Sequence, residues 1–245
     1  MPSADVLVVG AGISGACLAH HAARAGRSVL VVEREPRAGG CMHSERTPSG
    51  YWYELGAHTC YNSYGAFLEV LEGCGLLGQL QPRGKPVLRF HDGRRVVPGK
   101  NLLVLIRLFG KLELLASIPG WLGASAEGKT VREHYSRFVG KRNYERVLGP
   151  MLSAVPSQTA DEFPADMLFK KRERRQDVMR SFTLQGGLQT AVEGALRSDR
   201  IEARLGCGAQ RLERSGAGWK ATLDDGSTVE AGAVALAVPP GAAAA

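Results

Sequence analysis

Residues 5–33 read DVLVVGAGISGACLAHHAARAGRSVLVVE, and this stretch decides the fold. The apolar run 5–9 predicts a buried strand of a parallel sheet, and residues 28–32 predict a second one. Between them, residues 16–25 carry strong helix formers and small side chains, and Gly26 stands where a helix C-terminal cap belongs. Together these elements predict one βαβ unit of about thirty residues.

The three glycines between the first strand and the helix each have a physical reason. Gly10 permits a tight turn, Gly12 lets the backbone approach a pyrophosphate, and Gly15 allows the helix and strand to pack closely. The free N–H groups at the helix N-terminus and the positive end of its dipole would then face the phosphates. In this strand–turn–helix context the motif predicts a dinucleotide site rather than a turn without a ligand.

An acid follows at the end of the second strand. Glu33 lies 23 residues after Gly10, close to the ~20 expected for a carboxylate that accepts hydrogen bonds from ribose hydroxyls. The same carboxylate would repel a 2′-phosphate, so an NADP-type ligand is disfavoured. NAD and FAD share this first unit, and the residues beyond Glu33 must separate them.

Arg37-Ala38-Gly39-Gly40, with Ser44 beyond, resembles the R-x-G-G-x-x-x-S/T stretch of the flavin-containing amine oxidase superfamily. In that superfamily this loop runs back over the FAD pyrophosphate. The resemblance implies that Arg37 supplies charge and that Gly39 and Gly40 allow a close backbone approach. Many members carry an arginine directly after the two glycines, where this chain has Cys41.

Further segments extend the resemblance over most of the chain. Residues 53–58, YELGAH, match the next glycine turn beside the flavin, where His58 either meets flavin or substrate or serves as a loop histidine. Residues 148–155, 181–190 and 235–239 are similar to segments of protoporphyrinogen oxidases. Residues 208–212 match the strand whose backbone touches the adenine. The resemblance thus implies FAD, held by Gly10, Gly12, Ile13, Ser14, Gly15, Glu33, Arg34, Arg37, Gly39, Gly40, Ser44, Gly56, Ala57 and Ala209.

The predicted fold is an α/β, Rossmann-like FAD/NAD(P)-binding domain, with a parallel sheet and a β-meander, interrupted by a mainly helical insertion. Residues 1–85 form its first part, residues 86–180 the substrate-domain or membrane-associated insertion, and residues 181–245 the return. The resemblance implies a chain approaching twice this length. We therefore expect an N-terminal portion, without the C-terminal remainder.

Composition bounds the remaining classes. The chain has 245 residues, 44% apolar and 22% charged, with 31 Lys and Arg against 24 Asp and Glu. These values exclude disordered, collagenous and coiled-coil chains. The five cysteines form no CxxC and no zinc-type spacing, which favours a reduced cytoplasmic setting and no metal site. The basic run 170–175 has no interleaved aromatic residues, which argues against a nucleic-acid partner.

The resemblance implies an FAD-dependent oxidoreductase that dehydrogenates a lipophilic, porphyrinogen-like small molecule by hydride transfer to flavin. The basic insertion suits a substrate that carries carboxylates. No catalytic side chain can be named from the sequence. The alternatives are a UDP-galactopyranose mutase-like flavoenzyme, a relative of carotenoid desaturases or amine oxidases, and a truncated flavoprotein without turnover.

Residues 101–123 are unusually apolar. Lys100, Arg107 and Lys111 follow at spacings of seven and four, which predicts one basic stripe on a helix that ends near Trp121. Such a helix is typical of peripheral contact with a membrane surface, here on its inner face. A buried helix that lines an apolar pocket is the alternative.

Overall fold

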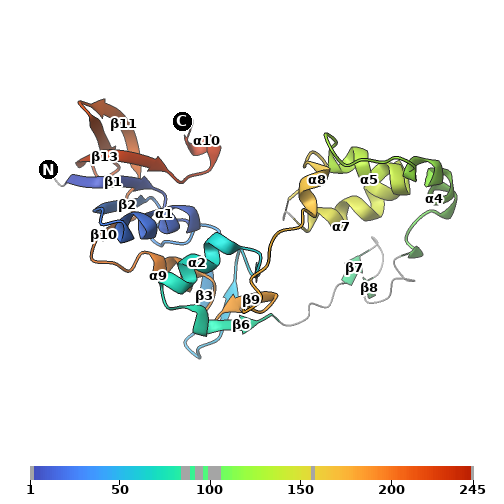
Figure 1. Cartoon of the computed structure of the whole chain (residues 1–245), viewed down its shortest axis with the longest axis horizontal. Helices are drawn as coiled ribbons and strands as arrows, with labels where there is room; N and C mark the ends of the chain where they lie inside the picture. The colour runs from blue at the N-terminus through green and yellow to red at the C-terminus, as the bar shows by residue number, and fades with distance from the viewer. Residues whose placement is uncertain (1–2, 84–88, 92–95, 99–105, 156–157, 244–245) are drawn as a thin grey trace. The chain divides into compact units, whose positions relative to one another are not determined.

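The computed structural model describes residues 3–83, 89–91, 96–98, 106–155 and 158–243 (Figure 1). The chain divides into two compact units, named here unit 1 (1–83 and 173–245) and unit 2 (84–172). The chain therefore leaves unit 1 once and returns to it once.

The return boundary lies at 172/173, eight residues before the expected 180/181, because the buried Asn62 holds the returning chain in unit 1. The Asn62 side-chain amide donates to the carbonyl oxygens of Arg175, at 2.8 Å, and Val178, at 3.1 Å. The Arg175 backbone N–H donates in turn to Asn62 O at 2.9 Å. The outgoing boundary lies at 83/84 rather than 85/86.

Unit 1 is built on a six-stranded sheet whose first four strands are parallel and whose last two complete an antiparallel meander. This arrangement confirms the expected parallel sheet with a β-meander. The strand order is β10 (Ile201–Leu205), β2 (Val29–Glu33), β1 (Ser3–Val9), β13 (Thr228–Leu236), β12 (Gly218–Leu223) and β11 (Ala209–Ser215).

Side chains alternate between the two faces of this sheet, as the period of a strand requires. Val8 and Val31 lie in a core that includes residues of α1 (Ile13–Arg24), α2 (Gly65–Gly73) and α9 (Gln189–Ala195). Their neighbours Leu7, Leu30 and Val32 belong to a second core with residues of β12 and β13. Burial on both faces explains why β1 and β2 are almost entirely apolar.

Unit 1 also contains two small sheets. One is the hairpin of β3 (Ser44–Arg46) and β4 (Trp52–Glu54). In the other, β9 (Ser181–Leu184) on the returning limb lies between β5 (Cys60–Tyr61) and β6 (Leu80–Pro82) on the outgoing limb. The two limbs are thus hydrogen-bonded to each other where the chain leaves and returns. The short helices η1 (Leu77–Gln79) and α10 (Pro240–Ala243) complete the described part of unit 1.

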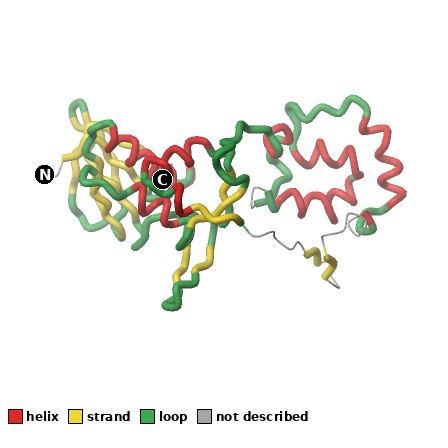
Figure 2. The backbone as a smooth tube through the Cα atoms, turned by 60° about the horizontal axis from the view of Figure 1, so that its bottom comes forward, coloured by secondary structure: helices red, strands yellow, loops and turns green. Residues whose placement is uncertain are grey.

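Unit 2 is mainly helical where it is described, apart from the hairpin of β7 (Arg89–His91) and β8 (Val96–Pro98), and Figure 2 shows its helices in red. A capping box of Thr130 and Glu133 starts the helix Val131–Val139. Its core gathers Val131, Tyr144 and Leu152. The helices are α4 (Lys111–Ser117), η2 (Ile118–Trp121), α5 (Val131–Val139), α6 (Lys141–Asn143), the π-helical turn η3 (Tyr144–Leu148), α7 (Gly149–Ser153) and α8 (Ala165–Leu168).

The sequence predicts one helix through residues 101–123, and this prediction is wrong for the described residues 106–123. Lys100 and residues 101–105 lie outside the described residues, and Arg107 lies in a turn. The Asn143 side chain binds the backbone N–H and C=O of Gly110, at 2.7 and 3.0 Å, so a new helix starts only at Lys111. Arg107 and Lys111 therefore do not share a helical stripe.

The alternative of a buried helix is also wrong for α4, because none of its residues is buried. Leu112 is 85% exposed, and Leu122, just after η2, is 82% exposed. Across the described ranges, no helix is both long and apolar enough to span a bilayer. The described apolar residues of this segment therefore form a surface rather than a core.

Candidate cofactor site

The glycine-rich turn joins β1 to α1 at the carboxyl end of the parallel strands. Gly10 has φ +102°, and a Cβ there would lie 2.6 Å from Ala237 O, just beyond β13. A Cβ at Gly15 would lie 2.0 Å from Gly10 O, on the protein's own backbone. Gly10 and Gly15 are therefore required by packing within the protein.

Gly12 differs from its two neighbours. It is the N-cap of α1, and a Cβ built on it would meet no protein atom within 4 Å. No side chain caps this end of the twelve-residue helix, because the N-cap residue is a glycine. The first N–H groups, from Ile13 and Ser14 onward, therefore receive no side-chain cap from Gly12. This open space beside the positive end of a helix dipole fits a pyrophosphate.

Glu33 ends β2 with its carboxylate held against the turn. One oxygen accepts a hydrogen bond from Ala11 N at 2.8 Å, and the other accepts from Glu35 N at 3.0 Å. These two backbone donors fix the carboxylate beside the glycine-rich turn. A carboxylate oxygen has more than one lone pair, so acceptor capacity remains for a ribose hydroxyl.

The loop with the predicted arginine and paired glycines lies on the same turn. Gly39 N donates to Ala11 O at 2.9 Å, and a Cβ on Gly40 would come within 3.3 Å of Gly12 Cα. Gly39 and Gly40 both have positive φ, at 130° and 56°, which favours glycine at each position. The Arg37 guanidinium donates to Gly40 O at 3.2 Å, so it folds over its own loop.

The second glycine turn lies against Cys41, directly after the paired glycines of this loop. Ala57 N donates to Cys41 O at 2.8 Å, and a Cβ on Gly56 would lie 2.1 Å from the same oxygen. His58 is exposed, with Nδ1 3.3 Å from Gly56 O. The structure therefore brings the 10–15, 37–41 and 56–57 segments together.

The predicted residues Arg34 and Ala209 lie beyond the carboxyl end of β2. Gly206 N and Cys207 N donate to Glu35 O and Glu33 O, both at 2.8 Å, so the β10–β11 connection runs beside residues 33–35. Ala209 begins β11 directly after this connection. The side chain of Arg34 is 74% exposed and lies within 3.9 Å of Glu35, so its charge is in solvent.

Ser44 is a predicted site residue whose side chain is hydrogen-bonded to other parts of the protein. It is 7% exposed, and its hydroxyl donates to Glu54 and accepts from Gln189 N. Its one donor is therefore used within the protein. Glu54 is not among the predicted site residues, because its backbone partner Leu188 lies 134 residues away and no local pattern indicates it.

Two cysteine thiols near these elements are unsuited to nucleophilic chemistry. Burial raises the pKa of Cys60 to about 12 and that of Cys17 to about 11, so both remain protonated at neutral pH. Among the described residues, no three His, Cys, Asp or Glu side chains come together as a metal site would require.

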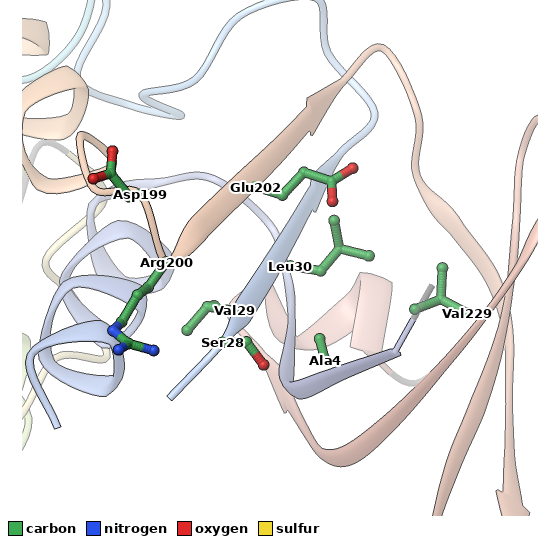
Figure 3. Close-up of a pocket in the computed structure, with 8 residues that line it drawn as sticks. All are labelled: Ala4, Ser28, Val29, Leu30, Asp199, Arg200, Glu202 and Val229. Carbon is green, nitrogen blue, oxygen red and sulfur yellow. The ribbon is translucent and has the colours of Figure 1, made fainter. Parts of the chain in front are cut away.

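A separate hollow of about 260 Å³ lies at the opposite, amino ends of the parallel strands (Figure 3). Ser28, Arg200 and Glu202 line it at the starts of β2 and β10. In open α/β sheets ligands bind beyond the carboxyl ends of the strands. The glycine-rich turn, rather than this hollow, is therefore the candidate cofactor site.

A family model described as "Flavin containing amine oxidoreductase" matches residues 13–245. AofH of Mycobacterium tuberculosis, named as a flavin-containing monoamine oxidase, is 27% identical over 96% of this chain and 57% of its own length. The chloroplastic protoporphyrinogen oxidase of Nicotiana tabacum is 30% identical over 62% of this chain and 29% of its own.

Solved structures show the same fold. A protein from Exiguobacterium sp. 255-15, described as a protoporphyrinogen oxidase, superposes with a TM-score of 0.71 at 19% identity. The alignment covers 97% of this chain and 59% of that one. The chain thus spans little more than half the length of AofH and of this structural relative.

Proposed function

Since the chain belongs to the flavin-containing amine oxidoreductase family, whose cofactor is FAD, we propose that its glycine-rich turn holds the ADP half of FAD. The observation that carries this proposal is the open space at Gly12, between an uncapped helix N-terminus and the Gly39–Gly40 loop. Glu33 would accept from the ribose hydroxyls, and the first N–H groups of α1 would donate to the pyrophosphate.

Bound FAD supplies the redox chemistry by accepting a hydride from the substrate. The residues of this chain bind and orient it. The loop with Arg37, Gly39 and Gly40 covers the pyrophosphate position and limits the access of water there. The turn of Gly56 and Ala57 supports this loop from the other side through Cys41 O.

For the substrate we propose a lipophilic, porphyrinogen-like molecule that is dehydrogenated. Residues 129–180 contain 12 Lys and Arg against 7 Asp and Glu, and this excess suits a substrate with carboxylates. The names of two relatives, from Nicotiana tabacum and Exiguobacterium sp. 255-15, support the same substrate class. AofH supports an amine as the second candidate, because it aligns over 96% of this chain.

The test is a visible absorption spectrum of the purified chain, followed by anaerobic substrate addition. We expect a flavin spectrum that bleaches when a porphyrinogen is added and stays unchanged with putrescine or an L-amino acid. Bleaching by an amine alone would move the proposal to the second candidate. A colourless protein that takes up no FAD on reconstitution would contradict the cofactor site itself.

We also propose that the exposed apolar surface of unit 2 contacts an anionic membrane surface. Leu112, Leu115 and Leu122 are 63–85% exposed, and Lys111 lies on the same short helix. Trp121 is 53% exposed, and its indole N–H donates to Phe138 O at 2.9 Å. Apolar side chains, a nearby cation and an aromatic residue together support an interfacial position.

Co-sedimentation with phosphatidylserine vesicles tests this contact. Leu112→Ser combined with Leu115→Ser should reduce the bound fraction by about tenfold, since each leucine contributes its buried apolar area. Leu205→Ser, at a 42% exposed leucine of unit 1, is the matched control and should bind normally. Equal binding of all three proteins would contradict the proposal.

A further inference from the structure

Glu54 has no role in the glycine motif, yet its carboxylate lies at the centre of a hydrogen-bond network. It is half-buried at the end of β4, whereas its neighbours Tyr53 and Leu55 are 46% and 60% exposed. A carboxylate withdrawn from water requires donors to replace its hydration. The partners of Glu54 therefore indicate what it does.

Those partners come from two distant parts of the chain. One carboxylate oxygen accepts from the Ser44 hydroxyl at 2.7 Å, and the other accepts from Leu188 N at 2.8 Å. The Ser44 hydroxyl accepts from Gln189 N at 3.1 Å, and Ser44 N donates to the Gln189 side chain at 3.2 Å. Three of these hydrogen bonds join the β3–β4 hairpin to the start of α9, and the fourth, between Ser44 and Glu54, links the two strands of the hairpin.

A close backbone approach makes this network possible. Gly187 has φ +99°, and a Cβ there would lie 2.3 Å from the Ser44 hydroxyl oxygen. On the same hairpin, the Arg46 guanidinium donates to Gly186 O at 2.8 Å. The hairpin therefore packs on residues 186–189 through its own side chains, and the lack of a side chain at Gly187 makes room for this contact.

The loop over the glycine-rich turn, residues 37–44, leads directly into this hairpin. Gly39 N binds Ala11 O at one end of that loop, and Met42 N binds Gly39 O within it. Ser44 is the last residue of the loop and the first residue of β3, and Leu55 N donates to His43 O beside it. The loop 37–44 therefore has one anchor at the cradle and a second anchor at Glu54.

We propose that Glu54 is a positioning residue for the cofactor, which holds loop 37–44 over the glycine-rich turn by binding Ser44 and Leu188. The inference rests on the proposed FAD site, although Glu54 itself does not touch the cofactor. With the anchor in place, the loop is ordered before FAD arrives. Without it, binding must also supply the free energy of ordering the loop, and affinity falls.

The experiment compares Glu54→Ala and Glu54→Gln with Glu45→Ala in the full chain. Glu45 is the matched control, because it lies on the same hairpin and its carboxylate pairs with His43. Hydrogen exchange of the FAD-free protein reports on loop order, and titration with FAD reports on affinity. Thermal unfolding of each FAD-free variant separates loop order from general stability.

Glu54→Ala should exchange faster at residues 38–44 than wild type, with β1 and β2 unchanged, and should bind FAD about tenfold more weakly. Glu54→Gln keeps an acceptor for Leu188 N and a partner for Ser44, so it should restore FAD affinity to within about threefold. Glu45→Ala should match wild type in both measurements.

Wild-type exchange at residues 38–44 in Glu54→Ala would overturn the inference, as would a lower unfolding temperature with unchanged FAD affinity. If Glu54→Ala does not fold, Ser44→Ala provides the same test, because it removes one of the two anchor contacts. If the wild-type chain takes up no FAD, the proposed function fails, and the exchange measurement alone still decides whether Glu54 orders the loop.

Discussion

The glycine-rich turn of unit 1 and the apolar segment 106–122 of unit 2 differ in how closely their residues pack against the rest of the protein. At the turn, Gly10 and Gly15 are so closely packed that an added Cβ would overlap the protein backbone. In the apolar segment, α4 buries no residue and Leu112 is 85% exposed. Close backbone contacts thus determine the shape of the proposed cofactor site, whereas the apolar segment exposes side chains that suit an external partner.

The largest expected effect is on FAD binding by Gly12→Val. Because the Cβ position at Gly12 is open, the apoprotein should keep its stability, while the branched side chain occupies the proposed pyrophosphate position. Affinity for FAD should fall at least about a hundredfold, measured by fluorescence titration. A variant that retains flavin on purification would contradict this assignment of the cradle.

Gly15→Ala tests the other half of the turn. Its Cβ would lie 2.0 Å from Gly10 O, a backbone atom that cannot move away. The clash should outweigh the better helix propensity of alanine and lower the free energy of unfolding by about 2 kcal/mol. Urea unfolding of the FAD-free protein measures this. An unchanged midpoint would show that the packing at the turn is looser than the structure indicates.

Asp161 tests the packed side of unit 2. It accepts from the Tyr144 hydroxyl at 2.7 Å and from Arg132, and these hydrogen bonds hold its pKa below the ordinary value. The folded carboxyl therefore has the lower pKa, so its stabilisation is complete above pH ~4 and is lost as the pH falls through the folded pKa.

Asp161→Asn should therefore lower the free energy of unfolding by about 1–2 kcal/mol at neutral pH. The difference from wild type should shrink below pH ~4, where the carboxyl is protonated first in the unfolded chain and then, through its lowered pKa, in the folded protein. Chemical denaturation followed by circular dichroism at several pH values measures both the loss of stability at neutral pH and its decrease at low pH. A difference that stays constant from pH 7 to pH 3 would mean that the aspartate is not the titrating group.

The smallest effect is expected at Leu112. Leu112→Ser removes a side chain that is 85% exposed, so the free energy of unfolding should change by less than about 0.5 kcal/mol. Urea unfolding in the absence of vesicles measures it. A larger loss would show that Leu112 packs against protein, and the contrast between the two regions would weaken accordingly.

The sequence predicts unit 1 well because its signals are local. A buried strand, a glycine turn and a helix follow one another directly. The steric reason for Gly15 lies within the turn, at Gly10 O, whereas Gly10 packs against Ala237 O, which is distant in the sequence. The acid at Glu33 is likewise predicted by its distance along the chain, and the structure places it against Ala11 N.

The features that the sequence did not predict depend on contacts between distant residues. The helix at Lys111 starts late because Asn143, 33 residues away, binds Gly110. Asn62 determines the return boundary through residues more than a hundred positions later. Glu54 finds its backbone partner 134 residues away, at Leu188. No local pattern indicates such pairs.

The pairing of β1 with β13 also has a consequence for biosynthesis. Val9 and Leu236 are register partners, and Ala237 N binds Val9 O at 2.8 Å, so the first strand completes its hydrogen bonds only with residues near the far end of this chain. At about 5–20 residues per second, a ribosome needs roughly 10–45 seconds to cover that distance. During this interval one edge of β1 lacks its partner, and the floor of the cradle at Gly10 is incomplete. Nascent chains should therefore acquire flavin only after Ala237, and with it the whole helical unit, has been synthesised.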